Sequence, residues 1–86
     1  MEKYQELVDK CKQAYENNNL KLAYKYWCDI FDTTLDELDK CGRDDDIKTY
    51  KIWSKHNEYL KQFTNEQVYA ITDFGKMLAY REMGYY

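Results

Sequence analysis

The stretch EKYQELVDKCKQAYENNNLKLAYKYWCDIF, residues 2–31, decides the fold of this chain. Apolar residues recur in it at intervals of three and four positions, which is the period of a helix with one buried face. The first stripe comprises Tyr4, Leu7, Val8, Cys11, Ala14 and Tyr15. The second comprises Leu20, Ala23, Trp27, Ile30 and Phe31. Two amphipathic helices with a short link between them are expected to pack as antiparallel neighbours.

The link is a run of three asparagines, residues 17–19, and asparagine suits both helix ends that meet there. It tolerates the left-handed conformation that ends a helix, and its side chain can cap the next helix. We therefore expect the first helix over residues 2–16 and the second to begin at the last asparagine. Two predictions compete for the second helix. It continues to about Lys40, or it breaks just before Thr34, which matches a capping box with Glu37; we favour the break.

Caps and stops also mark the helices of the second half. Gly42 is a helix stop, and aspartates 44–46 are N-cap candidates for a third helix that runs to about Phe63. Thr64 and Gln67 form the clearest capping box and start a fourth helix, which a tail over residues 83–86 follows. The inner face of the third helix is expected to carry Ile47, Tyr50, Trp53, Leu60 and Phe63. The inner face of the fourth is expected to carry Val68, Ile71, Phe74, Gly75 and Leu78.

No alternation of polar and apolar residues persists over five positions, so no strand is expected. The prediction is an all-α fold: a compact bundle of four short antiparallel-packed helices, or five if the second helix breaks, in a single domain over residues 1–86. Leu, Ile, Val and Phe contribute only 16 of the 86 residues, so ten Tyr and two Trp must supply much of the buried area. We expect a core rich in aromatic rings.

The sequence favours a cytoplasmic protein without a membrane partner. No apolar run reaches the roughly 18–20 residues that span a bilayer. The cysteines, Cys11, Cys28 and Cys41, are odd in number and widely spaced, which is typical of free thiols in a reducing compartment. A single disulfide among them stays open, as does the oligomeric state.

The residues that usually carry catalysis are scarce. Ser54 and His56 are the only serine and the only histidine, and two positions apart on a helix they point to different sides. The sequence has no metal-ligand spacing and no glycine-rich phosphate loop. The acidic run 44–46 lacks the alternating ligands and the glycine of a calcium loop. We expect no enzyme, no metal and no cofactor; a Cys–His pair assembled by the fold would overturn that expectation.

Charge is segregated along the chain. Residues 29–46 hold eight acidic and two basic side chains, a net charge of −6, whereas residues 47–63 hold four lysines and one glutamate, a net charge of +3. An acidic surface of this kind accelerates association with a basic partner and selects it. The acidic residues expected to bind a partner are Asp29, Asp32, Asp36, Glu37, Asp39, Asp44 and Asp45.

Tyrosine is the second signal for a binding surface. Tyr69 and Tyr80 share one face of the fourth helix with Asp73 and Lys76, opposite its apolar stripe, and Tyr24 also lies off the apolar face of its helix. Exposed tyrosine is favoured at interfaces because it offers a large contact area at a small entropic cost. We expect Tyr69 and Tyr80 to contact a partner.

These observations predict a small non-enzymatic protein-binding module that acts as a stoichiometric inhibitor or adaptor by occlusion. The partner is expected to be a protein with a basic surface of the nucleic-acid-binding type. Lys, Tyr and Asn, which have A/T-rich codons, are frequent, and in size and composition the chain resembles phage or mobile-element proteins that block host defences, such as anti-CRISPR proteins. The alternatives are an immunity or antitoxin-like protein, and nucleic-acid binding through Lys48, Lys51 and Lys55, against which the net charge of −3 argues.

Overall fold

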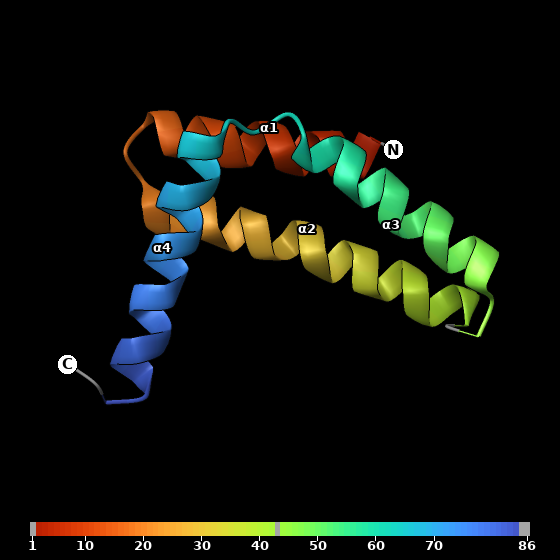
Figure 1. The fold of residues 1–86 in the computed structure, drawn as a ribbon. Coiled ribbons are helices and arrows are strands. Elements are labelled where there is room, and N and C mark those ends of the chain that lie inside the picture. Colours follow the sequence, from red (N-terminus) through yellow and green to blue (C-terminus); the bar gives the residue numbers. More distant parts are fainter. Residues whose placement is uncertain (1, 43, 85–86) are drawn as a thin grey trace.

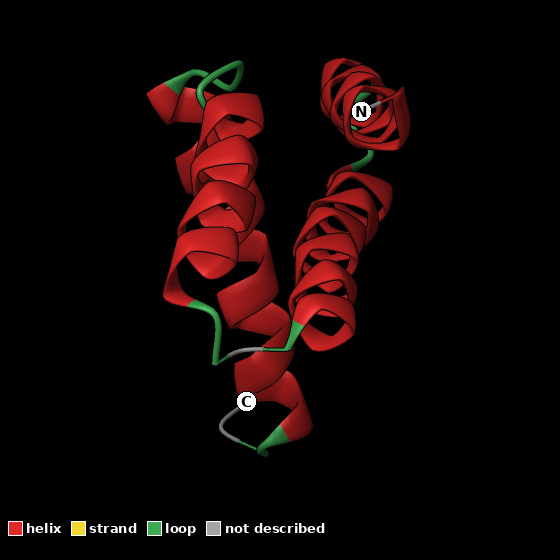
Figure 2. Cartoon of the chain, turned by 90° about the vertical axis from the view of Figure 1, so that its right-hand side faces the viewer, coloured by secondary structure: helices red, strands yellow, loops and turns green. Residues whose placement is uncertain are grey.

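Four helices make up most of the chain in a computed structural model that describes residues 2–42 and 44–84 (Figure 1). They are α1 (Glu2–Glu16), α2 (Leu20–Cys41), α3 (Asp46–Leu60) and α4 (Asn65–Glu82). No strand occurs in these described residues (Figure 2). The prediction of an all-α fold with four packed helices is confirmed. The predicted C-terminal tail begins where α4 ends, and its last two residues, 85 and 86, lie outside the described part.

The first two helices form the predicted hairpin, and the asparagines between them act as expected. Asn18 adopts a left-handed conformation with φ of 61°, and the Asn19 side chain accepts a hydrogen bond from the amide of Leu22. The two apolar stripes then meet in the core, where Val8 and Ile30 have no exposed surface. Burying side chains of this size stabilises a fold by roughly 1.5–3 kcal/mol each.

The predicted break in α2 is wrong, because α2 runs without interruption from Leu20 to Cys41. Thr34 does not cap a helix start; it is fully buried in the helix interior. Its hydroxyl donates to the carbonyl oxygen of Ile30, four residues earlier, at 3.3 Å, and the Thr33 hydroxyl donates in the same way to Asp29 at 2.8 Å. Threonine within a helix satisfies its hydroxyl by such a bond, so the same residue types serve an interior as well as a cap.

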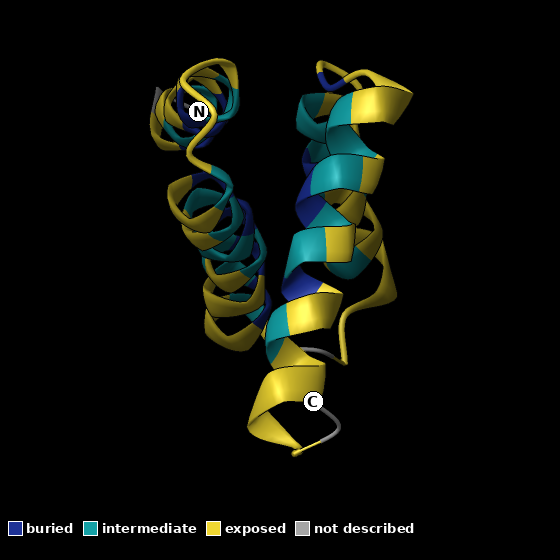
Figure 3. Cartoon of the chain, turned by 90° about the vertical axis from the view of Figure 1, so that its left-hand side faces the viewer, coloured by how far each residue is buried: buried dark blue, intermediate teal, exposed yellow. Residues whose placement is uncertain are grey.

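A second layer, formed by α3 and α4, lies over the hairpin. In Figures 2 and 3, α1 and α2 stand on one side and α3 and α4 on the other, with the buried residues turned toward the middle. Asp45 caps α3, and Thr64 and Gln67 form the predicted capping box at α4. Gly42, at φ of 77°, provides the left-handed turn that sends the chain from one layer to the other.

The predicted inner face of α3 is wrong in its first half. Ile47 and Tyr50 are 70% and 74% exposed, and the residue of α3 that is buried is His56. The reason is tertiary: α3 turns toward the hairpin the face that can reach the hydroxyl of Thr34, and Ile47 and Tyr50 lie away from that face. The apolar period alone could not reveal this, because it contains neither the hydrogen bond of His56 to Thr34 nor its packing against Phe31 on α2.

In α4, Ile71 and Gly75 are buried on the predicted inner face. A Cβ atom built on Gly75 would overlap the ring of Tyr24, so the glycine lets α4 approach α2 closely. The Tyr24 ring also packs edge to face on Phe74, with centroids 6.4 Å apart. While α1 and α3 run beside α2, α4 crosses it steeply (Figure 1).

Candidate functional site

The predicted acidic surface lies along the solvent side of α2. Its four aspartates, Asp29, Asp32, Asp36 and Asp39, recur at intervals of three and four residues, so they share one face of the helix. Asp29 is half-buried and the other three are exposed. The structure therefore brings this part of the predicted site together in one row.

Asp29, Glu37 and Asp45 are among the predicted acidic residues that have local partners. Asp29 Oδ2 lies 3.2 Å from Lys25 Nζ, and Glu37 Oε1 lies 3.6 Å from Lys55 Nζ. Asp45 caps α3 by accepting a hydrogen bond of 3.1 Å from an amide in the first turn of that helix. Ion pairs of this exposure are worth under about 1 kcal/mol, but they reduce the local negative charge. The exposed part of the predicted acidic surface lies along the middle of α2, and Asp44 is exposed beyond the end of that helix.

The tyrosine face of α4 has the predicted exposure. Tyr69 is 68% exposed and Tyr80 is 42% exposed, and Asp73 and Lys76 are exposed between them. Tyr24 differs from the expectation of an exposed ring, because it is half-buried against α4. Among the tyrosines singled out in the sequence, Tyr69 and Tyr80 of α4 are therefore the exposed ones.

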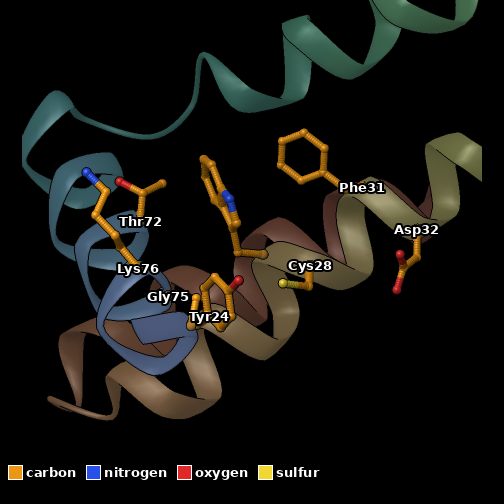
Figure 4. A pocket seen from close by; sticks show the side chains of 9 residues that line it. Tyr24, Cys28, Phe31, Asp32, Thr72, Gly75 and Lys76 are labelled. Carbon is orange, nitrogen blue, oxygen red and sulfur yellow. The ribbon is translucent and has the colours of Figure 1, made fainter. Parts of the chain in front are cut away.

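A groove of about 450 Å³ lies between α2 and α4 and joins these two surfaces (Figure 4). We call it the α2–α4 groove; its lining residues are Tyr24, Trp27, Cys28, Phe31, Asp32, Thr72, Gly75, Lys76 and Ala79. Three of the lining residues are aromatic, and all three come from α2. Asp32 stands at the α2 side, and Lys76 lies at the α4 side. One member of the acidic row and one member of the tyrosine face thus border the same apolar floor.

Sequence reasoning placed Trp27 and Phe31 in the core and missed this groove. The structure shows Trp27 nearly buried and Phe31 half-buried, with ring centroids 5.7 Å apart. One signal could have found the groove: Tyr24, Cys28 and Phe31 form an apolar stripe of helix period beside the core stripe. A helix with two adjacent apolar stripes offers more surface than a single neighbour covers.

The predicted lysine row does not form a continuous basic surface. Lys48 and Lys51 are exposed, whereas Lys55 is half-buried and turned toward the hairpin. Its Nζ atom lies 4.9 Å from the centre of the Tyr4 ring and 3.6 Å from Glu37. A lysine held by a carboxylate and an aromatic face is less available for phosphate, so nucleic acid would meet only two of the three residues.

His56 belongs to a buried hydrogen-bonded cluster and not to a cleft. Its Nδ1 atom lies 2.6 Å from the Thr34 hydroxyl oxygen, and the Tyr4 hydroxyl lies 2.8 Å from the same oxygen. The carbonyl oxygen of Ile30 lies 3.3 Å from the same hydroxyl, so Thr34 is the centre of the cluster. His56 Nε2 is buried without a hydrogen-bond partner.

The rings around His56 keep it neutral. Phe31 and Trp53 pack edge to face on the imidazole, with centroids 4.5 and 5.3 Å away. Burial in this apolar setting lowers the pKa of His56, because the charged form loses its hydration. Burial likewise raises the pKa of the Cys11 thiol to about 12. These groups are arranged for packing, and neither is activated for chemistry near neutral pH.

The described residues do not assemble the Cys–His pair that sequence reasoning left open. All three cysteines are free thiols. The thiol of Cys11 donates to the carbonyl of Ala23 at 3.1 Å, and that of Cys41 donates to Leu38 at 3.4 Å. Cys28 hydrogen-bonds the Tyr24 side chain, which raises the pKa of that tyrosine. Each thiol therefore has a partner other than His56.

The described residues hold neither a metal-binding cluster nor a helix that could span a membrane. No three His, Cys, Asp or Glu side chains among residues 2–42 and 44–84 come together in a way that could hold a metal ion. No helix in the same part of the chain combines the length and apolar character needed to cross a bilayer. Comparison with protein-family models, curated proteins and solved structures gave no match.

Proposed function

We propose that this chain is a non-enzymatic protein-binding module that inhibits or adapts its partner by occlusion. The observation that carries the proposal is the α2–α4 groove, which places an aromatic floor between an exposed acidic row and an exposed tyrosine face. Aromatic residues inside a charged rim are the usual composition of protein interfaces. The extents of 42 × 29 × 19 Å leave a face larger than the roughly 800 Å² that a standard interface takes from each partner.

The acidic row indicates the chemistry of the partner. Asp32, Asp36 and Asp39 are exposed on one side of α2, so a partner surface rich in Lys and Arg would complement them. Nucleic-acid-binding proteins carry such surfaces, and a bound acidic protein would block them. A cytoplasmic anti-defence protein of a phage or mobile element, similar in action to anti-CRISPR proteins, fits this mode; a helical antitoxin that covers a basic toxin fits it as well.

Charge reversal tests the proposal. Copurification from cells that encode the chain, followed by mass spectrometry, would identify the partner, and calorimetry would then give its affinity. The test variant replaces three exposed acids, Asp36, Asp39 and Asp44, with Lys; Asp45 is kept because it caps α3. We expect the dissociation constant to rise at least a hundredfold, since several like charges would then face a basic partner.

The matched control changes the net charge equally elsewhere. It replaces Asp9, Glu16 and Glu58, which are exposed and lie outside the acidic row, with Lys. The control should retain binding, and both variants should keep the helical circular dichroism spectrum. Equal losses in the two variants would show that net charge alone matters, and wild-type affinity in the test variant would remove the acidic row from the interface.

A salt titration of binding to DNA and RNA tests the nucleic-acid alternative. Binding to DNA or RNA through Lys48 and Lys51 would weaken steeply as salt rises, because counterions are released on binding. We expect no DNA or RNA binding even at low salt. A salt-dependent complex that is lost in Lys48→Glu and Lys51→Glu would replace the proposed function with that alternative.

A further inference from the structure

We propose that the α2–α4 groove receives an amphipathic helix of the partner, with Lys or Arg along the flank of that helix that faces α2. This inference rests on the proposed function and deepens it. It states which element of the partner docks, where it lies and how its charges are arranged.

The second layer leaves part of α2 uncovered. Both α3 and α4 pack on α2, at different ends, and they diverge from the link that joins them (Figure 1). In the angle between them, α2 presents a surface that neither helix covers, and the groove lies there (Figure 4). A further helix laid into this angle would complete the layer.

The residues of α2 that line the groove are spaced to contact a helix. Tyr24, Cys28, Phe31 and Leu35 follow one another at i, i+4, i+7 and i+11 along α2, and Leu35 is 39% exposed at the end of the row. Such a row is an apolar stripe along the helix, the spacing with which one helix packs lengthwise against another. An extended peptide would lack partners for its backbone, because the described residues are helical and offer no strand edge. The floor therefore suits a helix.

The two sides of the groove carry opposite charges. Asp32 stands at the α2 side, and Asp36 and Asp39 continue the exposed row four and seven residues later. Lys76 stands at the α4 side. A docked helix would match this asymmetry with basic residues at i, i+4 and i+7 on the α2 flank and an acidic residue on the α4 flank. The charges thus set the orientation of the helix, and its apolar face supplies the contact area.

Three synthetic peptides of about 18 residues, or five helical turns, test the inference against the full chain. The first carries Leu and Ala on one helical face and Lys at i, i+4 and i+7 on one flank. The second replaces those Lys with Glu. The third is the Lys peptide with two central prolines, which prevent a helix. Binding is followed by nitrogen–proton NMR spectra, which detect affinities as weak as millimolar and locate the contact.

We expect the Lys peptide to shift the amide signals of Cys28, Asp32, Thr72 and Gly75 and to bind at least about tenfold more tightly than the Glu peptide. The proline peptide should not bind. No binding of the Lys peptide, equal binding of the Lys and Glu peptides, or binding of the proline peptide would each overturn the inference.

Two matched pairs of variants sharpen the result. Ala79→Trp fills the groove from α4 and should abolish binding, whereas Met77→Trp, on an exposed position outside the groove, should not change it. Asp32→Lys should remove the preference for the Lys peptide, whereas Asp9→Lys, at an exposed position of α1 and with the same change in net charge, should keep it. Binding that is indifferent to Ala79→Trp and Asp32→Lys would place the peptide elsewhere.

The identified partner separates this inference from the proposed function. If reversal at Asp36, Asp39 and Asp44 abolishes partner binding and Ala79→Trp leaves it intact, the acidic surface works without a helix in the groove, and only the inference fails. If neither variant affects the partner, the proposed function fails as well. Loss of binding in both supports the two together.

Discussion

The α1–α2 hairpin and the α3–α4 layer are made of similar amphipathic helices but are held in different ways. In the hairpin, Val8, Cys11, Ala23 and Ile30 are fully buried, and the two apolar stripes cover one another. The α3 helix is attached through a buried histidine, and α4 through a glycine that accepts the ring of Tyr24. The hairpin supplies most of the buried core, which Phe63 and Ile71 complete from the second half of the chain, whereas the second layer leaves part of α2 uncovered. This difference places most of the buried core in the hairpin and the candidate binding groove between the two layers.

The largest expected effect breaks the hairpin. Ile30→Ala removes a fully buried side chain and leaves a cavity, so we expect the free energy of unfolding to fall by about 2–5 kcal/mol. The matched change in the second layer is Ile47→Ala, whose side chain is 70% exposed and should cost less than about 0.5 kcal/mol. Urea unfolding followed by circular dichroism measures both. Similar losses in the two variants would mean that Ile47 lies against a surface that the fold does not show.

A smaller effect tests how α4 is attached. Gly75→Ala places a methyl group where the Tyr24 ring lies, and we expect a loss of about 1–3 kcal/mol from overpacking. In a Tyr24→Ala background the overlap is gone, and the same substitution should stabilise the helix by about 1 kcal/mol. The reversal of sign in this double-mutant cycle is the decisive measurement. Destabilisation in both backgrounds would mean that the glycine serves another purpose.

The smallest effect concerns pH and the attachment of α3. Burial lowers the pKa of His56 below its ordinary value of 6.5, so the unfolded chain takes up this proton first as the pH falls. The contribution of His56 is complete above pH 6.5 and is lost as the pH drops toward the lowered pKa, with a slope below about 1.4 kcal/mol per pH unit. Urea unfolding between about pH 5 and 8 should show this loss.

His56→Gln is the control for the pH experiment. The glutamine amide can donate a hydrogen bond to Thr34 or accept one from it but cannot titrate, so the difference in stability between this variant and the natural chain should shrink as the pH falls. The carboxylates titrate in both proteins, and their contribution cancels in the difference. A constant difference across the pH range would mean that His56 keeps its ordinary pKa in the folded protein.

Local signals in the sequence predicted the ends of the helices well. Asn18, Asn19, Gly42 and Thr64 all act as the residue types indicated, because caps and left-handed turns depend on a few adjacent residues. The same reasoning failed at Thr34, where the capping-box pattern was present but a longer helix was more stable. Its hydroxyl has buried partners on three helices, and no local pattern contains them.

The candidate site was predicted only in part. The acidic row and the exposure of Tyr69 and Tyr80 follow from helix period, and the structure has both. The groove that joins them depends on where α4 crosses α2, and that crossing depends on the fit of Tyr24 against Gly75. A sequence read one helix at a time has no access to that fit.

The amino-acid sequence by itself determined that the chain is helical, where the four helices begin, and which charges and tyrosines share a face, because these properties arise from residues within a few turns of one another. Only the tertiary structure decided that α2 is unbroken, that His56 and not Ile47 faces inward, and that an aromatic groove stays open between α2 and α4. Those outcomes depend on contacts between residues up to 30 or more positions apart, such as Tyr4 with Thr34, where shape and hydrogen bonding select one packing.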